Sequence, residues 1–399
     1  MKPLLITIAI VVSGYLPAQA QVAGGRTVLA TNTTELREAL AEAKPGTTIR
    51  IAAGTYAGGL FSRTLQGEPG NPIVLTAADP EHPPVIDGGT VALHLSSPAY
   101  VEIRQLVITK STGNGLSIDD GGSLDHPAHH LVLHGLVVRE IGPKGNRDGI
   151  KLSGVDDFLV ENCTIERWGS GGSGIDMVGC HRGKIVDCTF RYEGNLEANG
   201  VQAKGGSRDI LVQRSRFEHA GSRAVNVGGS TGLAYFRPKA PGYEAKDITV
   251  EDCTFLGSQT PIAFVGVDGA LVRHNTIYCP SRWAFRILQE NKEPGFVASR
   301  GGRFTDNIIT YRSAEMGDPV NIGPNTSPET FVMARNAWYS LDAPARSRPK
   351  LTLEEVDGIY GTDPQFHDAA NGDLRLRPES RLAQFGVRAD SKSAVKSNP

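Results

Sequence analysis

The sequence has 399 residues, a formal net charge of −2 at neutral pH, 47 glycines, 24 prolines and 7% aromatic residues. This charge excludes the general basic field of a nucleic-acid-binding protein and the polybasic patch of a membrane-surface protein. A local cluster of lysines and arginines can still bind a polyanion. Abundant glycine and proline favour many short strands joined by turns.

The first residues have the features of a secretory signal peptide. Residues 1–20 contain one lysine, an apolar run over 4–12 and a small-residue exit that ends at Ala20. The run is too short for a membrane anchor, and no later segment is apolar enough to span a bilayer. We expect a soluble monomer, secreted or periplasmic, that binds neither nucleic acid nor a membrane.

One amphipathic helix is expected over residues 33–43. Thr33 or Thr34 is the candidate N-cap, and Lys44-Pro45-Gly46 would end the helix. A short helix of this kind can cover the exposed end of a repeat protein.

Two short phrases recur along the chain. The first is DGIK at 148–151, SGID at 173–176, NGVQ at 199–202 and RAVN at 223–226. The second is VENCTI at 160–165, IVDCTF at 185–190 and VEDCTF at 250–255. Alternating strands that recur within periods of roughly 20 to 50 residues are typical of a solenoid with stacked coils.

The cysteines of the second phrase hold equivalent positions. Cys163, Cys188 and Cys253 each follow the same pattern, which predicts a ladder of small buried groups rather than a disulfide framework. A bridge between Cys163 and Cys188 stays open, because neighbouring coils lie roughly 4.8 Å apart.

The spacing of the phrases also predicts the domain boundaries. We expect a signal peptide (1–20), an N-terminal segment with the helix (21–46), the solenoid (47–341), and a C-terminal wrap with a frayed tail (342–399). Residues 228–245 and 287–302 should leave the solenoid as loops, because the strands on either side keep their register. Loops on a rigid scaffold often carry the binding surface.

At this point a family resemblance is visible. GTTIRIAAGTY, VIDGG, the repeats and DPQF…GDLRLRP resemble right-handed parallel β-helix proteins of the pectate-lyase-like superfamily. The resemblance implies an all-β fold, a right-handed single-stranded parallel β-helix with an N-terminal capping helix. That fold hosts lyases, hydrolases, epimerases and adhesins, so activity must be argued from the site.

Stacking turns sequence columns into surface columns. Along each strand, the residue that follows an inward apolar residue points outward. The residue two positions after that outward residue points outward as well. A contiguous polar patch is therefore predicted from Lys151, Asp176, Gln202, Lys204 and Asn226.

This patch has the ingredients for eliminative cleavage of a uronic-acid polysaccharide. A base must remove the proton next to the carboxylate, a cation must neutralise that carboxylate, and the leaving oxygen must be protonated. A lysine can be the base, and a calcium ion held by carboxylates can be the cation. Asp148 and Asp176 stand on adjacent coils beside Lys151 and Lys204.

A narrower resemblance bears on the metal. DGIKL, GGSGIDM and NGVQAKGG resemble polysaccharide lyase family 9, which implies that Asp148 and Asp176 are calcium ligands. Glu197, in a nearby irregular segment, is a further candidate metal ligand. The extra aspartate pair of that family is Gly172-Ser173 here. The resemblance leaves both Lys151 and Lys204 as candidate bases.

A second resemblance favours one lysine. AKGGSRDI resembles the lysine segment of lyase family 6, which implies Lys204 as the base with Arg223 or Arg286 as its arginine partner. The calcium-binding glutamate pair of that family is missing. Lys151, Lys204 and Arg223 are therefore the candidate catalytic residues. The alternatives are solvated lysines, and aspartates that only cap turns.

Further residues are expected to bind substrate. Aromatic and cationic side chains of the first long loop can stack on sugar rings and hold carboxylates. The candidates are Gln202, Asn226, Arg286, Tyr235, Arg237, Lys239 and His130.

The sequence thus predicts a secreted lyase that cleaves an anionic, uronic-acid-containing polysaccharide by β-elimination, with calcium as a possible cofactor. The alternatives are a C5 epimerase, a glycoside hydrolase, and a non-catalytic carbohydrate-binding β-helix protein. An inverting hydrolase would need two carboxylates about 6.5 to 9.5 Å apart, for which Asp148 and Asp176 are candidates.

Overall fold

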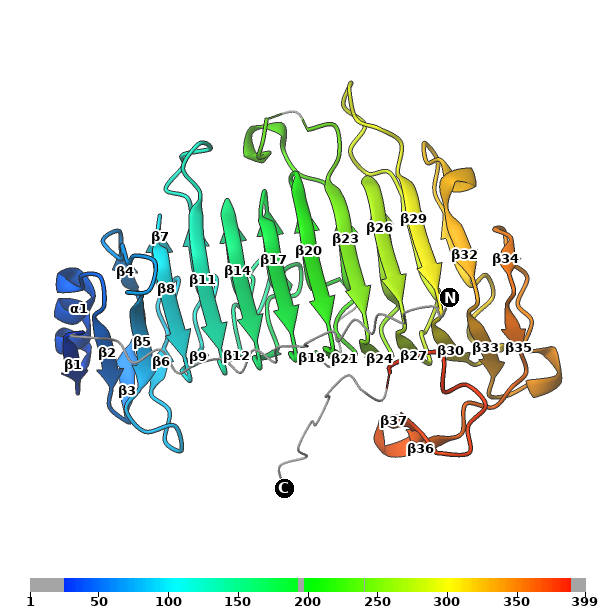
Figure 1. The fold of residues 1–399 in the computed structure, drawn as a ribbon, viewed down its shortest axis with the longest axis horizontal. Helices are drawn as coiled ribbons and strands as arrows, with labels where there is room; N and C mark the ends of the chain where they lie inside the picture. Colours follow the sequence, from blue (N-terminus) through cyan, green and yellow to red (C-terminus); the bar gives the residue numbers. More distant parts are fainter. Residues whose placement is uncertain (1–24, 193–196, 240, 389–399) are drawn as a thin grey trace, which may run out of the picture.

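The computed structural model describes residues 25–192, 197–239 and 241–388. The predicted signal peptide lies outside the described residues. The chain winds into a parallel β-helix, in which successive coils add strands to a 13-stranded, a 10-stranded and a 12-stranded sheet (Figure 1). No helix among these residues has the length and apolarity needed to cross a membrane.

The strands of each sheet follow in chain order. The 13-stranded sheet contains β1 (Thr27–Ala30), β2 (Thr48–Ile51), β5 (Ile73–Ala77), β8 (Ala99–Arg104), β11 (Ala128–His134), β14 (Val155–Glu161), β17 (His181–Val186), β20 (Ser207–Gln213), β23 (Ala245–Glu251), β26 (Val267–Arg273), β29 (Arg300–Thr305), β32 (Val332–Ala334) and β34 (Glu355–Val356). The 10-stranded sheet contains β4 (Leu60–Ser62), β7 (Leu93–Ser96), β10 (Leu116–Asp119), β13 (Ile150–Ser153), β16 (Ser173–Val178), β19 (Asn199–Lys204), β22 (Arg223–Gly228), β25 (Thr260–Val265), β28 (Phe285–Leu288) and β31 (Val320–Ile322). The 12-stranded sheet contains β3 (Thr55–Ala57), β6 (Val85–Asp87), β9 (Val107–Thr109), β12 (Val137–Arg139), β15 (Thr164–Glu166), β18 (Thr189–Arg191), β21 (Arg216–Glu218), β24 (Thr254–Leu256), β27 (Thr276–Tyr278), β30 (Ile308–Tyr311), β33 (Ala337–Ser340) and β35 (Ile359–Tyr360). The remaining elements are the helix α1 (Thr33–Glu42), the hairpin strands β36 (Phe366–Asp368) and β37 (Asp373–Leu376), and the 3-10 turns η1 (Leu233–Tyr235), η2 (Pro328–Thr330), η3 (Pro344–Arg346) and η4 (Ala369–Asn371).

Helix α1 covers the N-terminal end of the β-helix, as predicted (Figure 1). Its N-cap is Asn32, whose Oδ1 accepts a hydrogen bond from the Glu35 N–H at 3.0 Å. The Glu35 carboxylate in turn accepts one from the Thr31 N–H at 2.8 Å. The prediction of Thr33 or Thr34 as the cap is wrong by one or two residues, because the extended backbone that a cap requires is at Asn32.

The interior is filled by stacked columns of like residues. Phe217 packs between Phe190 and Phe255 with ring centroids 4.8 Å apart on each side, which matches the spacing of the strands. The predicted cysteine ladder is present, since Cys163, Cys188 and Cys253 are buried and free. Stacking of equivalent residues therefore forms a continuous core.

The strand register confirms the predicted column on the 10-stranded sheet. Lys151 pairs with Asp176, Asp176 with Gln202, and Gln202 with Asn226 on successive strands. The apolar residue before each of them points inward; Ile175, for example, is fully buried. We call the outward face of the 10-stranded sheet the wall.

Several loops leave the β-helix where the 10-stranded sheet turns into the 13-stranded sheet. Three of them are residues 120–127, 229–244 (leaving out residue 240, which the structure does not describe) and 289–299, and they project along the same edge of the molecule (Figure 1). The first of the two predicted loops is confirmed. The second is shorter than predicted, because β28 and β29 each extend into it.

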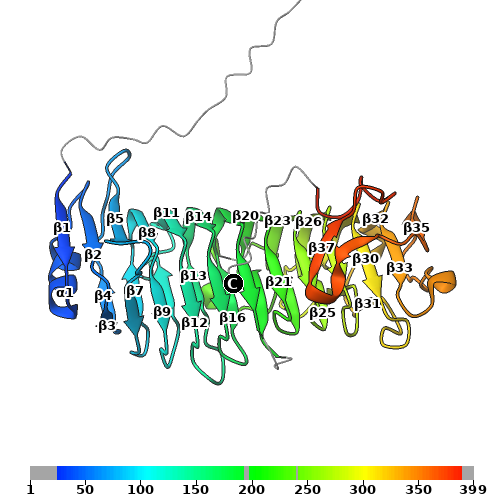
Figure 2. The ribbon, with the colours of Figure 1, turned by 90° about the horizontal axis from the view of Figure 1, so that it is seen from below.

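The C-terminal segment differs from the prediction. The strands β34 and β35 continue the β-helix beyond residue 341. The β36–β37 hairpin then folds back along the 12-stranded sheet rather than over the last coil alone (Figure 2), with the Phe366 ring 6.1 Å from the Tyr278 ring. Arg388 reaches Asp252 on an earlier coil, where its Nε lies 2.8 Å from Oδ1.

The phenylalanine stack generates a stability prediction. Replacing Phe217 by alanine leaves a cavity between two rings, and we expect the free energy of unfolding to fall by about 3 to 5 kcal/mol. Urea unfolding followed by circular dichroism measures the change. Leu29→Ala is the matched control, because Leu29 is 54% exposed, and it should shift stability by less than about 0.5 kcal/mol. Equal effects for the two variants would contradict a packed interior at Phe217.

Candidate functional site

Two lysines and two aspartates converge on the wall. The Lys151 ammonium hydrogen-bonds the Asp176 carboxylate and lies 3.6 Å from Asp148 Oδ2. Lys204 Nζ lies 3.5 Å from Asp176 Oδ1 and donates to Gln202 Oε1 at 3.1 Å. Asp176 therefore sits between two ammonium groups. We call Asp148, Lys151, Asp176 and Lys204 the Lys–Asp cluster.

The coil geometry explains why these four residues meet. Lys151 and Asp176 are register partners on β13 and β16, and Lys204 ends β19 on the next coil. Asp148 lies in the turn before β13, where its N–H donates to Asn114 Oδ1 at 2.9 Å. Its Oδ1 accepts from the Ser173 N–H of the following coil at 2.8 Å.

The two aspartates are shielded from water. The Asp148 and Asp176 side chains are 3% and 1% exposed, whereas those of Lys151 and Lys204 are 22% and 16% exposed. The outward position of Asp176 was predicted, but its burial was not. The carboxylates thus form the floor of the cluster, and the ammonium groups face the solvent side.

Burial and charge set the protonation of the cluster. Burial, reinforced by the neighbouring Asp176 carboxylate, raises the pKa of Asp148 to about 6. Burial alone would lower the pKa of Lys151, but the carboxylates of Asp176 and Asp148 outweigh it and raise that pKa. Lys151 therefore carries its charge at neutral pH.

A cleft of about 730 Å3 opens above the cluster. Its floor includes Lys151 and Lys204, and its sides come from the loops 120–127 and 229–244. The lining residues are Asp120, Gly122, Leu124, Asn146, Lys151, Ser153, Gly154, Val178, Lys204, Ser230, Thr231, Gly232, Ala234, Tyr235, Arg237 and Lys239. The lysine side chains are thus the part of the cluster that a bound molecule would meet.

Gly229 lets the loop 229–244 leave the wall beside the cluster. Its φ is +154°, and a Cβ there would lie 2.7 Å from Gln202 Nε2 and 3.2 Å from Lys204 Cδ. Any larger residue would displace the Gln202 amide and press against the Lys204 side chain.

Arg237 and Glu244 fix this loop in place. Arg237 Nη1 donates to Asp156 Oδ1 at 2.6 Å, and its Nε donates to the carbonyl of Leu124 in the opposite loop at 3.1 Å. The buried Glu244 carboxylate accepts from the Thr231 N–H at 2.9 Å. Arg237 lines the cleft, but its side chain is 9% exposed and bound to these partners, which favours a structural role over the predicted binding of substrate. It braces the two sides of the cleft.

The other predicted substrate residues divide into those near the cleft and those away from it. Tyr235 and Lys239 line it, as predicted. Gln202 and Asn226 lie on the wall but are 8% and 1% exposed. His130 belongs to β11 of the 13-stranded sheet, where its ring stacks on Tyr100 at 4.4 Å. The structure does not bring His130 to the site.

The two predicted arginines lie further along the wall. Arg223 donates to Glu290 at 2.6 Å and to Asn226 Oδ1 at 3.3 Å. Arg286 donates to Asn321 Oδ1 at 2.9 Å, two coils beyond Arg223. Neither lines the cleft above the Lys–Asp cluster.

The cluster does not offer the donor set that calcium requires. Calcium takes six to eight oxygen ligands, but here the Lys151 ammonium contacts both Asp148 and Asp176. Glu197 does not join them, and no group of three or more His, Cys, Asp or Glu side chains that could hold a metal occurs in the described parts of the chain. The fit expected from the family resemblance is not met.

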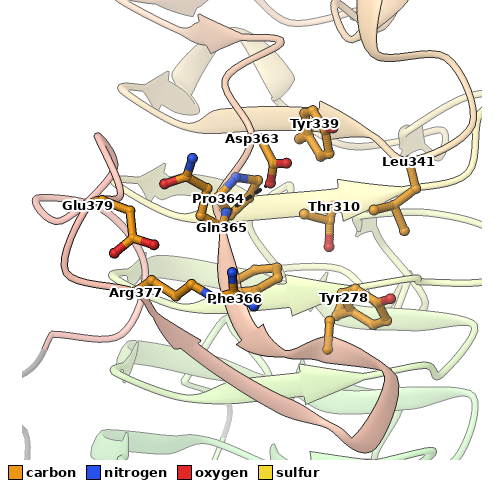
Figure 3. A pocket seen from close by; sticks show the side chains of 11 residues that line it. Tyr278, Thr310, Tyr339, Leu341, Asp363, Pro364, Gln365, Phe366, Arg377 and Glu379 are labelled. Carbon is orange, nitrogen blue, oxygen red and sulfur yellow. Dashed lines mark hydrogen bonds between the residues drawn. The ribbon is translucent and has the colours of Figure 1, made fainter.

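A second cleft, of about 440 Å3, lies under the C-terminal segment (Figure 3). Tyr278, Thr310 and Tyr339 line it from the 12-stranded sheet, and Phe366 and Arg377 line it from the hairpin region. It is on a different sheet from the Lys–Asp cluster and is not part of that site.

Comparisons with known proteins bear on the fold. A family model described as a right-handed beta helix region matches residues 127–309. No curated protein sequence matches the chain. An alginate lyase from Paenibacillus sp. str. FPU-7 is 20% identical with a TM-score of 0.52, and the match covers 84% of this chain and 98% of that one.

Two further solved structures share the architecture. A pectate lyase is 13% identical with a TM-score of 0.55, covering 95% of this chain and 96% of its own. The A-module of a mannuronan C-5 epimerase from Azotobacter vinelandii is 12% identical with a TM-score of 0.53, covering 83% and 96%. At these identities the likeness establishes the fold, a right-handed parallel β-helix.

The pKa of Asp148 generates a pH prediction. In the folded chain Asp148 keeps its proton up to about pH 6, whereas its ordinary value is 3.8. Its contribution to stability is therefore full below about pH 4 and is lost as the pH rises through about 6. Wild type should lose roughly 3 kcal/mol more than Asp148→Asn between pH 4 and pH 7.

Urea unfolding at a series of pH values measures this difference. Asparagine cannot ionise, but its Oδ1 can still accept the Ser173 N–H. Parallel stability curves for the two proteins would show that Asp148 titrates normally.

Proposed function

We propose that this right-handed parallel β-helix protein is a polysaccharide lyase that cleaves a uronic-acid-containing polysaccharide by β-elimination. The observation that carries the proposal is the Lys–Asp cluster, which presents two lysine ammonium groups to a cleft above buried carboxylates. The cations suit a substrate that carries a carboxylate on each reacting sugar. Two of the three solved structures compared above are lyases of such polymers, and the third is an epimerase.

Lys204 is the better candidate base. Each carboxylate contact makes an ammonium harder to deprotonate. Lys204 has one such contact, at 3.5 Å, whereas Lys151 is held by both Asp176 and Asp148. Lys151, with its raised pKa, is suited to remain charged and to face the substrate carboxylate.

The proposed elimination accounts for every proton and electron pair. After the Lys204 ammonium has lost a proton to solvent, its neutral amine takes the proton from the carbon next to the uronate carboxylate. The electron pair of that C–H bond becomes the new carbon–carbon double bond, and the glycosidic C–O bond on the adjacent carbon breaks. The leaving oxygen takes up a proton, which the Lys204 ammonium can return. The Lys151 ammonium stabilises the charge that develops on the carboxylate in between.

The arrangement argues against inverting hydrolysis. That mechanism leaves room for a water molecule between two carboxyl groups. Here a single ammonium nitrogen, that of Lys151, contacts both carboxylates and fills this gap. A C5 epimerase shares the proton abstraction and is separated from a lyase by its product, which keeps the glycosidic bond.

We also propose that the protein is exported, on the basis of the signal-peptide features of residues 1–20. Fractionation of cells that express the full chain tests this. A protein found only in the cytoplasm would refute export.

Removing the base should abolish elimination. Lys204→Ala is expected to lower kcat on a polyuronate by about 10²- to 10⁴-fold without unfolding the protein. Ultraviolet absorbance of the unsaturated uronate measures the rate on pectate, alginate and glycosaminoglycans. Lys184→Ala is the matched control, because Lys184 is an exposed lysine on β17 of the 13-stranded sheet. If no polyuronate gives an unsaturated product with wild type, the lyase proposal fails.

The donor set generates a prediction about metal removal. Because Lys151 already lies between Asp148 and Asp176, we propose that elimination needs no calcium. Treatment with a chelator followed by gel filtration should change kcat/KM by less than about twofold. Loss of activity that returns on adding calcium would contradict this assignment of Lys151.

A further inference from the structure

A group of arginines with few carboxylate partners lies further along the wall from the cleft. Arg223 comes from β22, Arg286 from β28, and Arg282 precedes β28. Trp283 stands among them. The sequence analysis named Arg223 and Arg286 as candidate site residues, but it did not name Arg282 or Trp283.

Trp283 organises two of the guanidinium groups. The Arg282 and Arg286 guanidinium carbons lie 4.0 Å and 4.3 Å from the centre of the Trp283 ring. The Nε of Arg286 also donates to Asn321 Oδ1 at 2.9 Å. Stacking and this hydrogen bond hold Arg286, and among the described residues its two terminal nitrogens have no hydrogen-bond partner, so they are available for a ligand.

The charge of the group is not balanced within the protein. Glu290 is bound to Arg223 at 2.6 Å. In the described parts of the chain, no carboxylate lies within salt-bridge distance of Arg282 or Arg286. Burial, and to a smaller extent repulsion from Arg223, lowers the pKa of Arg286. An arginine that is half-buried beside a second arginine is a site prepared for an anion.

The arginine group shares the wall with the Lys–Asp cluster. Arg286 is the register partner of Ala263, which pairs with Asn226, which in turn pairs with Gln202. Three strand spacings therefore separate the strand of Lys204 from that of Arg286, roughly 14 Å along the β-helix. The two coils between them, those of β22 and β25, carry only buried residues at their outward positions: Asn226 and Gly228 on β22, and Ala263 and Val265 on β25. One extended polymer lying along the wall can reach both places.

We propose that Arg282, Trp283 and Arg286 form a distal subsite, which binds an anionic group of a sugar several residues away from the bond that is cleaved. The planar guanidinium of Arg286 pairs with a carboxylate through two parallel hydrogen bonds. Trp283 holds the guanidinium groups of Arg282 and Arg286 in place by stacking. This subsite selects long anionic chains. The inference rests on the proposed function only for the class of polymer that is bound.

The subsite is tested by binding to a chain that is not degraded. Lys204→Ala serves as the background, and calorimetry measures the Kd for a polyuronate. Adding Arg286→Gln should weaken binding about tenfold, the loss expected for a charge-assisted hydrogen bond. Arg303→Gln on β29 is the matched control, because Arg303 is exposed on the 13-stranded sheet, and it should leave the Kd unchanged. Arg282→Gln provides a second variant at an exposed position, in case Arg286→Gln is less stable.

Three further measurements identify the chemical group that the subsite recognises. A neutral polysaccharide should bind equally to all variants. A sulfated glycan that shows the same loss as the polyuronate would assign the subsite to anionic sugars in general, whereas loss with the polyuronate alone assigns it to carboxylates. In the active enzyme, Arg286→Gln should raise KM for polymer while kcat changes little, and a trisaccharide too short to span the wall should show no change.

The outcomes separate this inference from the proposed function. Unchanged Kd and KM in both Arg286→Gln and Arg282→Gln would overturn the subsite, even if the protein is a lyase. Weaker polyuronate binding in a protein that yields no unsaturated product would support the subsite and refute the lyase.

Discussion

The site depends on the parallel register in which β13, β16 and β19 pair. That register sets Lys151, Asp176 and Gln202 one strand spacing apart, roughly 4.8 Å. A one-residue slip would turn these side chains into the core and bring their apolar neighbours to the surface. The inward column, represented by the fully buried Ile175, makes such a slip costly. The packing that stabilises the β-helix therefore also positions the charged groups.

Burial then gives the aspartates and the lysines of the Lys–Asp cluster different roles. The carboxylates of Asp148 and Asp176 lie beneath the surface, and they hold Lys151 in its charged form. Lys204 has a weaker tie to the same floor, 3.5 Å from Asp176. The loop 229–244, held by Arg237, lines the cleft above them. A fixed cation and a less restrained lysine in one cleft are what proton abstraction beside a carboxylate requires.

The sequence predicted features that follow from periodicity. The alternation of apolar and polar residues was enough to bring Lys151, Asp176 and Lys204 to one face. It could not reveal the role of Arg237, whose partner Asp156 is 81 residues away. It also misplaced His130, because that residue belongs to another sheet. The calcium expectation came from motif resemblance, which could not show that the Lys151 side chain contacts both Asp148 and Asp176.

A crystal structure of Lys204→Ala with a bound uronate oligosaccharide tests the central claim most directly. The account predicts a sugar ring in the cleft, with its carboxylate facing the Lys151 ammonium and the adjacent carbon facing position 204. An oligosaccharide bound only elsewhere, for example in the cleft beside Tyr339 and Phe366 (Figure 3), would contradict it.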